Sequence, residues 1–312
     1  MAVLSIQSHV VYGYAGNTAA VFPLQRLGHE VWAINTVEFS NHTGFGAWRG
    51  KILDADLTMD LVTGLEERGV IKNCEAVLSG YLGNAQTGKT IESAVEKIRR
   101  ISPGALYCCD PVMGDFGRGF YVKSEIRQII KNDLVPLADI VFPNHFELQE
   151  LSGINIENKD DALKALDILH DTGPSIILVT SFKEKQNKTG TESSPVITAQ
   201  LPVLSMIASM RKGGVREIHE VTTPELPLGE DIAGTGDMTA AVFLSRFLKT
   251  GDLKTALELC AASVFGILEA SHKTASPLKE GPMQIKIIDC QEQLANPSFH
   301  FKAEKIYYNE KK

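Results

Sequence analysis

The sequence lacks any long uninterrupted apolar segment, and its first residues lack the basic stretch that opens a signal peptide. No segment approaches the ~18 consecutive apolar residues that a membrane-spanning helix needs. Positive charge is also scarce, because 31 Lys and Arg face 38 Asp and Glu and leave a net charge of −7. An acidic surface repels the phosphates of nucleic acids and of anionic lipids. We therefore expect a cytoplasmic protein with neither nucleic acid nor membrane as its partner.

Cysteine is sparse and odd in number, with five residues in 312 and no pair at the spacing of a zinc-binding motif. This usage is typical of reduced thiols in a cytosolic protein. Cys108 and Cys109 are adjacent, so in a strand they would point to opposite faces. A dinucleotide-binding fingerprint is missing as well, since residues 13–16 supply only two glycines. These absences exclude a zinc finger and a nicotinamide-dependent dehydrogenase.

The sequence does contain a regular alternation of short apolar runs and longer segments with helical periodicity. The apolar runs lie at 3–6, 31–34, 76–78, 105–109, 140–142 and 176–179, and the main helical segments at 17–27, 57–68, 90–101 and 162–169. Strands that are apolar almost throughout predict a mostly parallel sheet with helices on both faces. We expect a single α/β domain over residues 1–312, because no linker or repeat interrupts the pattern.

Two stretches break this alternation. Residues 36–50 are aromatic and rich in glycine, which favours a small β flap over a crossover helix. Residues 183–195 are charged and rich in Ser and Thr, which predicts a flexible surface loop. The β-like runs within 195–221 predict antiparallel strands at the edge of the sheet.

Polar or turn-forming residues follow each of the six apolar runs. They include Ser8, Tyr81, Asp110, Asn144 and Thr180. Ligands of open α/β sheets bind at the carboxyl ends of the strands. Loops are usually polar, so one polar residue after a strand is weak evidence for a site. Polar or turn-forming residues after all six apolar runs favour a site at this edge of the sheet.

Residues 232–237 (IAGTGD) form the first of two candidate phosphate sites. A helical segment follows at 238–249, so Gly234, Thr235 and Gly236 would lie where free backbone N–H groups and the helix dipole hold anions. Asp237 could accept a proton from an attacking hydroxyl while the amides stabilise the transferred phosphoryl group. An Asp in a first turn is more often only a cap, and on these residues alone that simpler interpretation is ahead.

Residues 83–90 (GNAQTGKT) are the second candidate, because they match the P-loop pattern literally. They follow a predicted strand and precede a predicted helix, and Asp110 ends the next apolar run as a Walker B aspartate does. A P-loop normally follows its strand directly, whereas residues 79–82 intervene here. On the residues alone the two candidates are close, so a P-loop ATPase that uses Lys89 stays open.

Several blocks of the sequence together resemble the pyridoxal kinases of the ribokinase superfamily, most closely the bacterial type. The blocks are 5–13 (SIQSHVVYG), 39–44 (FSNHTG), 78–83 (LSGYLG), 109–115 (CDPVMGD), 143–147 (PNHFE) and 234–237 (GTGD). Each is weak by itself, but the ordered set spans residues 3 to about 250 and is highly specific. The resemblance implies a ribokinase-like three-layer α/β fold and transfer of phosphate from MgATP to the 5′-hydroxymethyl group of pyridoxal, which yields pyridoxal 5′-phosphate in vitamin B6 salvage.

The resemblance also implies a role for each matching position. Asp237 matches the catalytic base, and Gly234, Thr235 and Gly236 match the anion hole. The positions implied to bind or cover the pyridine ring are Ser8, Phe39, His42, Thr43, Gly44 and Tyr81. The positions implied on the nucleotide side, besides the glycines of the anion hole, are Asp110, Asp115, Tyr121, Phe142, Asn144, Glu147, Thr180 and Ser181. Of these, Asp110, Asp115 and Glu147 are implied to hold Mg²⁺, and a homodimer is implied for the family.

The sequence departs from the family pattern at Phe142, where some members have a small or hydroxylated residue, so a monovalent cation such as K⁺ stays open. Ala233 replaces a Val, and residues 183–230 are longer than in bacterial relatives. Hydroxymethylpyrimidine kinase is the nearest rival function, since it shares the fold, the base and the chemistry. A non-catalytic vitamin B6-binding protein is a further alternative, which the intact Asp237, Asn144 and Glu147 disfavour.

Overall fold

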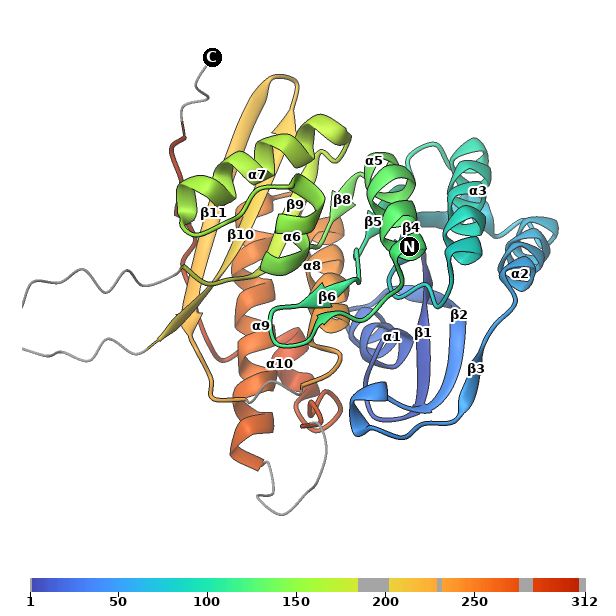
Figure 1. Ribbon diagram of the computed structural model, residues 1–312, viewed down its shortest axis with the longest axis horizontal. Coiled ribbons are helices and arrows are strands. Elements are labelled where there is room, and N and C mark those ends of the chain that lie inside the picture. Colours follow the sequence, from blue (N-terminus) through green and yellow to red (C-terminus); the bar gives the residue numbers. More distant parts are fainter. Residues whose placement is uncertain (1, 185–201, 229–231, 275–282, 309–312) are drawn as a thin grey trace, which may run out of the picture.

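The computed structural model describes residues 2–184, 202–228, 232–274 and 283–308. These residues build a large β-sheet with helices on both of its faces (Figure 1). Within the described ranges the sheet has ten strands in the order β12-β11-β10-β9-β8-β5-β4-β1-β2-β3. The strands are β1 (Ala2–Tyr12), β2 (Glu30–Asn41), β3 (Gly50–Ile52), β4 (Cys74–Ser79), β5 (Leu106–Cys109), β8 (Ile140–Val141), β9 (Ile176–Phe182), β10 (Val203–Lys212), β11 (Val215–Pro224) and β12 (Glu304–Lys305).

The centre of the sheet is parallel and its two edges are antiparallel. Strands β2, β1, β4, β5, β8 and β9 run parallel to one another, and each overlaps one of the six apolar runs of the sequence. The mostly parallel sheet predicted from those runs is therefore confirmed. Cys108 packs into the core on one face and Cys109 into the core on the other, as expected for neighbours in a strand.

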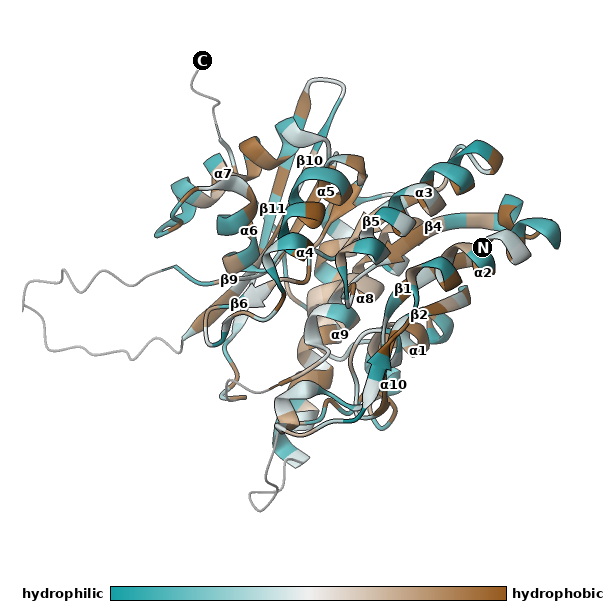
Figure 2. Cartoon of the chain, turned by 45° about the vertical axis from the view of Figure 1, so that its right-hand side comes forward, coloured by the Kyte–Doolittle hydropathy of each residue, from teal (hydrophilic) through white to brown (hydrophobic). Residues whose placement is uncertain are grey.

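The helices form one layer on each face of the sheet. One layer contains α2 (Ala55–Glu67), α3 (Ala85–Ile101), α4 (Ser124–Ile129), α5 (Val135–Leu137), α6 (His145–Ser152) and α7 (Lys159–Thr172). The other contains α1 (Asn17–Arg26), α8 (Thr235–Thr250), α9 (Leu253–Thr274) and α10 (Gln291–Ala295). Figure 2 shows hydrophobic strands between helices whose outer turns are largely hydrophilic. Within the described part of the chain, no helix is both long and apolar enough to cross a membrane.

A small flap rises from one end of this sheet. Strands β1 and β2 stay paired as far as Tyr12 and Asn41, well beyond the apolar runs that predicted them. The short strand β3 then returns antiparallel to β2, with Phe39 opposite Gly50, and the turn η1 (Thr43–Phe45) lies between them. The β flap predicted for residues 36–50 is confirmed, and it continues directly from two central strands.

The helix predicted for residues 90–101 begins earlier than expected, at Ala85. Asn84 is its N-cap, and the side chain of Asn84 accepts a hydrogen bond from the Thr87 backbone N–H (2.9 Å). An Asn in this position satisfies one of the N–H groups that a helix terminus leaves free. The first turns of α3 therefore contain most of the P-loop match.

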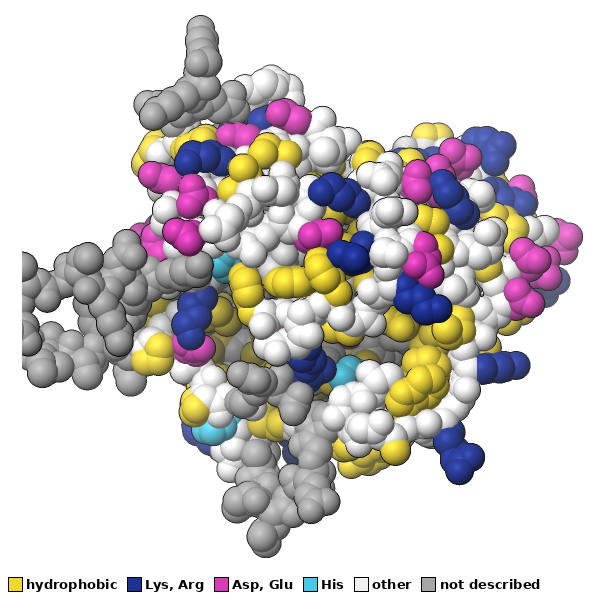
Figure 3. Space-filling model, in the orientation of Figure 1, with side chains coloured by type: hydrophobic (Ala, Val, Ile, Leu, Met, Phe, Trp, Pro, Cys, Tyr) yellow, Lys and Arg dark blue, Asp and Glu magenta, His cyan; other side chains and the backbone are white. Residues whose placement is uncertain are grey.

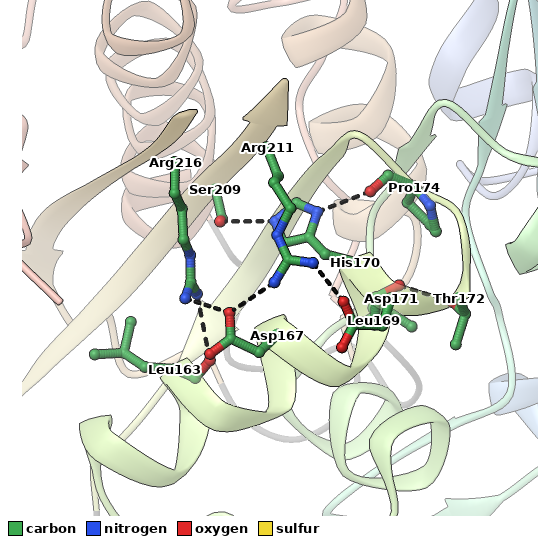
Figure 4. A network of polar contacts seen from close by, with 10 residues as sticks. All are labelled: Leu163, Asp167, Leu169, His170, Asp171, Thr172, Pro174, Ser209, Arg211 and Arg216. Carbon is green, nitrogen blue, oxygen red and sulfur yellow. Dashed lines mark hydrogen bonds and ion pairs between the residues drawn. The ribbon is translucent and has the colours of Figure 1, made fainter. Parts of the chain in front are cut away.

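Antiparallel strands β10 and β11 complete one side of the sheet, as predicted for the described part of residues 195–221. The loop predicted for 183–195 lies, apart from its first two residues, outside the described residues. A polar network ties these strands to α7 (Figure 4). His170 bonds the hydroxyl of Ser209 (2.8 Å), and Asp167 pairs with Arg211 and Arg216. Burial lowers the pKa of His170 to about 4, so this histidine is neutral at pH 7.

Candidate active site

The N-terminus of α8 is open to an anion. Its N-cap is Gly234, which adopts the left-handed conformation (φ 80°, ψ 2°) and provides no side-chain cap. The first hydrogen bond within the helix runs from the Met238 N–H to the Gly234 carbonyl (3.0 Å). The N–H groups of Thr235 and Gly236 therefore have no acceptor within the helix, which is the arrangement that binds phosphates.

Gly234 is required at this position for steric reasons as well. A Cβ atom there would lie 2.3 Å from the carbonyl oxygen of Tyr14, and the positive φ angle disfavours any residue with a side chain. The backbone after β1 thus packs directly against the first turn of α8. The anion site and the turn after β1 form one structural unit.

Asp237 lies in this first turn and faces the same backbone. Its carboxylate accepts hydrogen bonds from the Gly16 amide and from its own amide. Burial raises the pKa of Asp237, and these two amides lower it in part. Gly16 also contacts Ser8, since a Cβ atom at Gly16 would lie 2.2 Å from the Ser8 carbonyl oxygen. The structure therefore brings Ser8, Gly16 and Asp237 together.

A second carboxylate, Asp110, faces the anion site from the end of β5. Its Oδ2 atom lies 3.9 Å from the point where a Cβ atom of Gly236 would be. Burial, followed by the negative charges of Glu147 and Asp237, raises the pKa of Asp110 well above its usual range. The side chain is only 7% exposed. The three carboxylates therefore repel one another across a small region at the carboxyl ends of the strands.

Glu147 is held in place by the backbone of two loops. Its Oε1 accepts a hydrogen bond from the Met113 N–H (2.9 Å) and its Oε2 one from the Asn144 N–H (3.0 Å). Burial raises the pKa of Glu147 to about 7 against the opposing effect of these amides. Asn144 caps α6 and donates through its side chain to the Gly114 carbonyl (2.8 Å). Both residues thus fix the loop that carries Asp115.

Asp115 and Tyr121 flank this carboxylate group. Asp115 lies in the hairpin of β6 (Gly114–Asp115) and β7 (Gly119–Phe120), and its charge adds to the field at Glu147. Burial and the charges of Glu147 and Asp110 raise the pKa of the Tyr121 phenol. The Tyr121 backbone N–H donates to the Met113 carbonyl (3.1 Å), which ties it to the same loop.

A metal ion fits this region only with help from a substrate. Within the described residues no three His, Cys, Asp or Glu side chains lie close enough to hold a metal ion by themselves. Mg²⁺ commonly binds through one or two carboxylates together with substrate phosphates and water. Oxygen donors whose charges repel one another suit such a cation. Asp110, Asp115 and Glu147 therefore do not form a ready-made metal site, and their part in binding Mg²⁺ stays a prediction.

A small apolar cluster lies where the ends of β1 and β2 pass into the flap. Val10, Ala15, Val37 and Phe39 form a buried cluster against which Tyr81 packs. The Phe39 ring lies 4.1 Å from the Trp48 ring, and burial raises the pKa of the Tyr81 phenol. Figure 3 shows a hollow beside hydrophobic side chains that gather over the flap. An aromatic ring of a substrate would fit against this cluster.

Five further predicted residues occupy two separate places. His42, Thr43 and Gly44 form the turn of the flap, where the Gly44 N–H donates to His42 Nδ1 (3.1 Å). Thr180 and Ser181 lie in β9 beside the end of β8, and the Thr180 N–H donates to the Pro143 carbonyl (3.0 Å). Contacts of these five residues with a ligand stay predictions.

The side chain of Phe142 points into the core, away from the predicted nucleotide side. Its side chain is 1% exposed and its ring lies 6.0 Å from that of Phe243 in the core under α8. The family resemblance implies that Phe142 lies on the nucleotide side. In the structure the ring continues the apolar strand into the core, and a contact of Phe142 with the nucleotide stays a prediction.

The P-loop match is not a phosphate loop in this structure. Residues 85–90 are already helical, so the N–H groups of that turn point along α3 and do not surround an anion. Gly88 is buried in the contact of α3 with α4, where a Cβ atom would lie 2.3 Å from Ile129 Cγ2. Lys89 is exposed and pairs with Asp133 (3.0 Å) and Glu92 (3.3 Å). The pattern thus arises from helix packing and capping.

We expect Lys89→Ala to leave ATP turnover within about twofold of the unchanged protein, since exposed substitutions away from a site alter free energies by about 0.5 kcal/mol or less. A coupled assay of ADP release with purified protein measures this. A loss of a hundredfold or more would restore the P-loop interpretation.

The sequence pattern did not indicate one residue that contacts the site, Gly16, whose amide bonds the Asp237 carboxylate. The glycines of residues 13–16 do not match a dinucleotide motif, so that motif gives them no role. A short glycine-rich turn at the exit of the first strand was a usable signal, because such a turn allows close backbone approach. Its partner, the first turn of α8, is more than 200 residues away and has no counterpart in the local pattern.

Comparisons with known proteins agree with this geometry. A family model described as Phosphomethylpyrimidine kinase matches residues 67–282. The chain is 44% identical over 304 residues to the pyridoxal kinase PdxY of Rubrobacter xylanophilus, with 97% of each chain covered. It is 40% identical over 308 residues to that of Deinococcus radiodurans, covering 97% of this chain and 96% of the relative. The solved structure of pyridoxal kinase from Leishmania donovani in complex with ADP and pyridoxamine has a TM-score of 0.86 at 27% identity, covering 98% of this chain and 99% of that chain.

Proposed function

This chain belongs to the pyridoxal kinase family and is an ATP-dependent kinase of pyridoxal, and we propose that Asp237 is the general base of the transfer. The ribokinase-like fold predicted from the sequence is confirmed. One observation supports the assignment of the base most strongly. Asp237 projects from the first turn of a long helix in which the Thr235 and Gly236 N–H groups have no acceptor within the helix, so a carboxylate and a candidate phosphate site adjoin each other.

In this proposal Asp237 accepts the proton of the 5′-hydroxymethyl group as its oxygen attacks the γ-phosphoryl group of ATP. A base must be ionised to act, and its efficiency rises as its pKa approaches the working pH. Burial of Asp237 moves its pKa in that direction. The N–H groups that follow Gly234 stabilise charge that develops on the phosphoryl oxygens, because they are fixed before the reaction begins.

The acceptor ring is proposed to lie between the Ser8 side of β1 and the flap. Phe39 and Tyr81 supply apolar contact surface, and Ser8 supplies a polar group at the edge of that surface. His42, Thr43 and Gly44 are proposed to cover the ring from the turn of the flap. Such a cover excludes water, which competes with the acceptor for the phosphoryl group.

The nucleotide phosphates are proposed to lie between α8 and the carboxylates on β5, β6 and α6. Asp110 and Glu147, with Asp115 nearby, are proposed to hold Mg²⁺ directly or through water. When bound, the cation neutralises charge on the phosphates. Tyr121, Thr180, Ser181 and the backbone of Phe142 are proposed on the nucleotide side, and K⁺ is a further candidate ion there. The homodimer, the single domain over 1–312 and the cytoplasmic location also stay predictions.

The substrate experiment is an ADP-release assay with pyridoxal, pyridoxine, pyridoxamine and hydroxymethylpyrimidine. We expect pyridoxal-dependent ADP formation, and a lower kcat/KM for hydroxymethylpyrimidine by about 10–200-fold, the range that about 1–3 kcal/mol of pocket contacts provides. Higher kcat/KM with hydroxymethylpyrimidine would favour the rival kinase. Binding of pyridoxal without any dependent ADP release would favour a non-catalytic binding protein.

A further inference from the structure

A buried polar network joins the start of α1 to strands β1 and β2. The Ser5 hydroxyl donates to Asn17 Oδ1 (2.7 Å), and Gln7 Nε2 donates to the Ser5 hydroxyl (2.9 Å). Asn17 Nδ2 in turn donates to the Ile34 carbonyl (3.0 Å) and to Asn35 Oδ1 (2.8 Å). Asn17 is thus the residue at which β1, β2 and α1 meet.

The network lies in a place where polar side chains are costly. Ser5, Gln7 and Asn17 are 0%, 1% and 3% exposed. A buried polar group left without a partner costs about 1–3 kcal/mol, while apolar residues of the same shape can be close to neutral. Apolar residues of the same shape would therefore fill this space with about the same stability. Both polar atoms of the Asn17 side chain have partners, although Gln7 Oε1 has none among the described residues. What the bonds of Asn17 add is a fixed position for the backbone that they join, since buried hydrogen bonds make their surroundings rigid.

The backbone next to Asn17 is the part of the molecule that contacts the anion site. Gly16 precedes Asn17 directly, serves as the N-cap of α1 and donates its amide to the Asp237 carboxylate. The carbonyl of Tyr14 contacts Gly234 so closely that no Cβ atom fits between them. A displacement of the start of α1 would therefore move a hydrogen-bond donor of Asp237 and a wall of the anion site together.

We propose that Asn17 is a positioning residue for phosphoryl transfer. By holding the first turn of α1 against β1 and β2, it sets the place of the Gly16 amide and so the direction of the Asp237 carboxylate. This inference rests on the proposed function of Asp237 as the base. Asn17 itself touches neither the acceptor nor the nucleotide in this scheme.

Replacement of Asn17 with Ala tests the proposal. We expect kcat to fall about tenfold to a hundredfold, the usual effect of a misplaced reacting group, while KM for pyridoxal and for ATP stays within about threefold. KM is expected to hold because the contacts proposed for the substrates come from Ser8, Tyr81, the flap and the carboxylates on β5, β6 and α6, and Asn17 hydrogen-bonds none of these. Steady-state kinetics with each substrate varied in turn measure the separation of kcat from KM. An unchanged kcat in folded Asn17→Ala overturns the proposal.

A second pair of variants controls for stability. Ser5→Ala and Ser209→Ala each remove a hydroxyl that is 0% exposed and hydrogen-bonded to a side chain, one beside Asn17 and the other beside His170 in the distant network. We expect both to lower Tm, and only Ser5→Ala to lower kcat. If Asn17→Ala does not fold, the kcat values of Ser5→Ala and Ser209→Ala test the positioning role in its place. Equal kcat values for Ser5→Ala and Ser209→Ala overturn the proposal.

The double variant with Asp237→Asn separates this inference from the function on which it rests. If Asn17 acts only through Asp237, then Asn17→Ala lowers kcat no further once Asp237 is replaced, because groups that act as a unit are not additive. A further drop of tenfold would show an independent structural effect and overturn the positioning role. If Asp237→Asn alone keeps full kcat, the base assignment fails and this inference fails with it. If Asp237→Asn loses kcat while Asn17→Ala keeps it, only the inference fails.

Discussion

Replacing Asp237 with Asn is expected to lower kcat by about 10²–10⁴-fold, which is the usual contribution of a correctly placed general base. The amide has the size of the carboxylate and can still accept the Gly16 hydrogen bond, but it cannot take the proton of the acceptor hydroxyl. Binding of both substrates should persist. Steady-state kinetics give kcat, and titration of pyridoxal against the variant gives its affinity.

The competing interpretation of Asp237 is a simple helix cap, and it predicts a different result. A first-turn carboxylate stabilises a helix by about 0.3–1 kcal/mol through the dipole, with no effect on the chemical step. Asp56 is an exposed carboxylate in the first turn of α2, so Asp56→Asn is the matched control. Similar kcat values for Asp237→Asn and Asp56→Asn would support the cap and remove the proposed base.

Asp110→Asn is expected to change stability and turnover in opposite directions. The pKa of Asp110 in the folded protein is raised above its unfolded value of about 3.9, first by burial and then by Glu147 and Asp237. The folded state therefore holds more protons than the unfolded state above that pH, so the free energy of unfolding falls as pH rises. Glu147, whose pKa is raised to about 7, extends this decline to neutral pH.

An amide at position 110 stays neutral throughout this range. In the absence of nucleotide and divalent cation, we expect Asp110→Asn to have a higher Tm than the unchanged protein at pH 8, with the difference shrinking towards pH 5. Turnover with MgATP should fall at least about tenfold if the Asp110 carboxylate holds Mg²⁺ at the phosphates. Stabilisation of developing charge at such sites commonly contributes a factor of this size or more to the rate. Thermal unfolding at pH 5, 6.5 and 8 measures the first effect. A Tm difference that is the same at all three pH values would contradict this electrostatic account.

The sheet was predictable from the sequence because its central strands are buried on both faces. Runs such as residues 176–179 are apolar at every position, which few other environments require. The lengths of β1 and β2 were not predictable, since Ser8 and His9 interrupt the apolar run while the backbone pairing continues. Hydropathy therefore located the strands and missed the part of them that builds the flap.

The site was predictable only in part. Asp237 and the glycines around it could be proposed from helical periodicity, but the resemblance to a family was needed to rank them above residues 83–90. The P-loop pattern misled because capping by Asn84 and close packing at Gly88 require the same residue types as a phosphate loop. The role of Gly16 depends on a contact across more than 200 residues, and no local pattern encodes such a distance.

The flap has no separate connecting loop at its base, because β1 and β2 pass into it as continuous strands. The pairing of these two strands changes register at one place, between Gln7 and His9, immediately before the flap. A bend that lets pyridoxal in and its phosphate ester out would concentrate at this irregular step, where the ladder is already interrupted. Ser8 lies between Gln7 and His9, so the residue proposed to bind the vitamin also lies where the flap would bend.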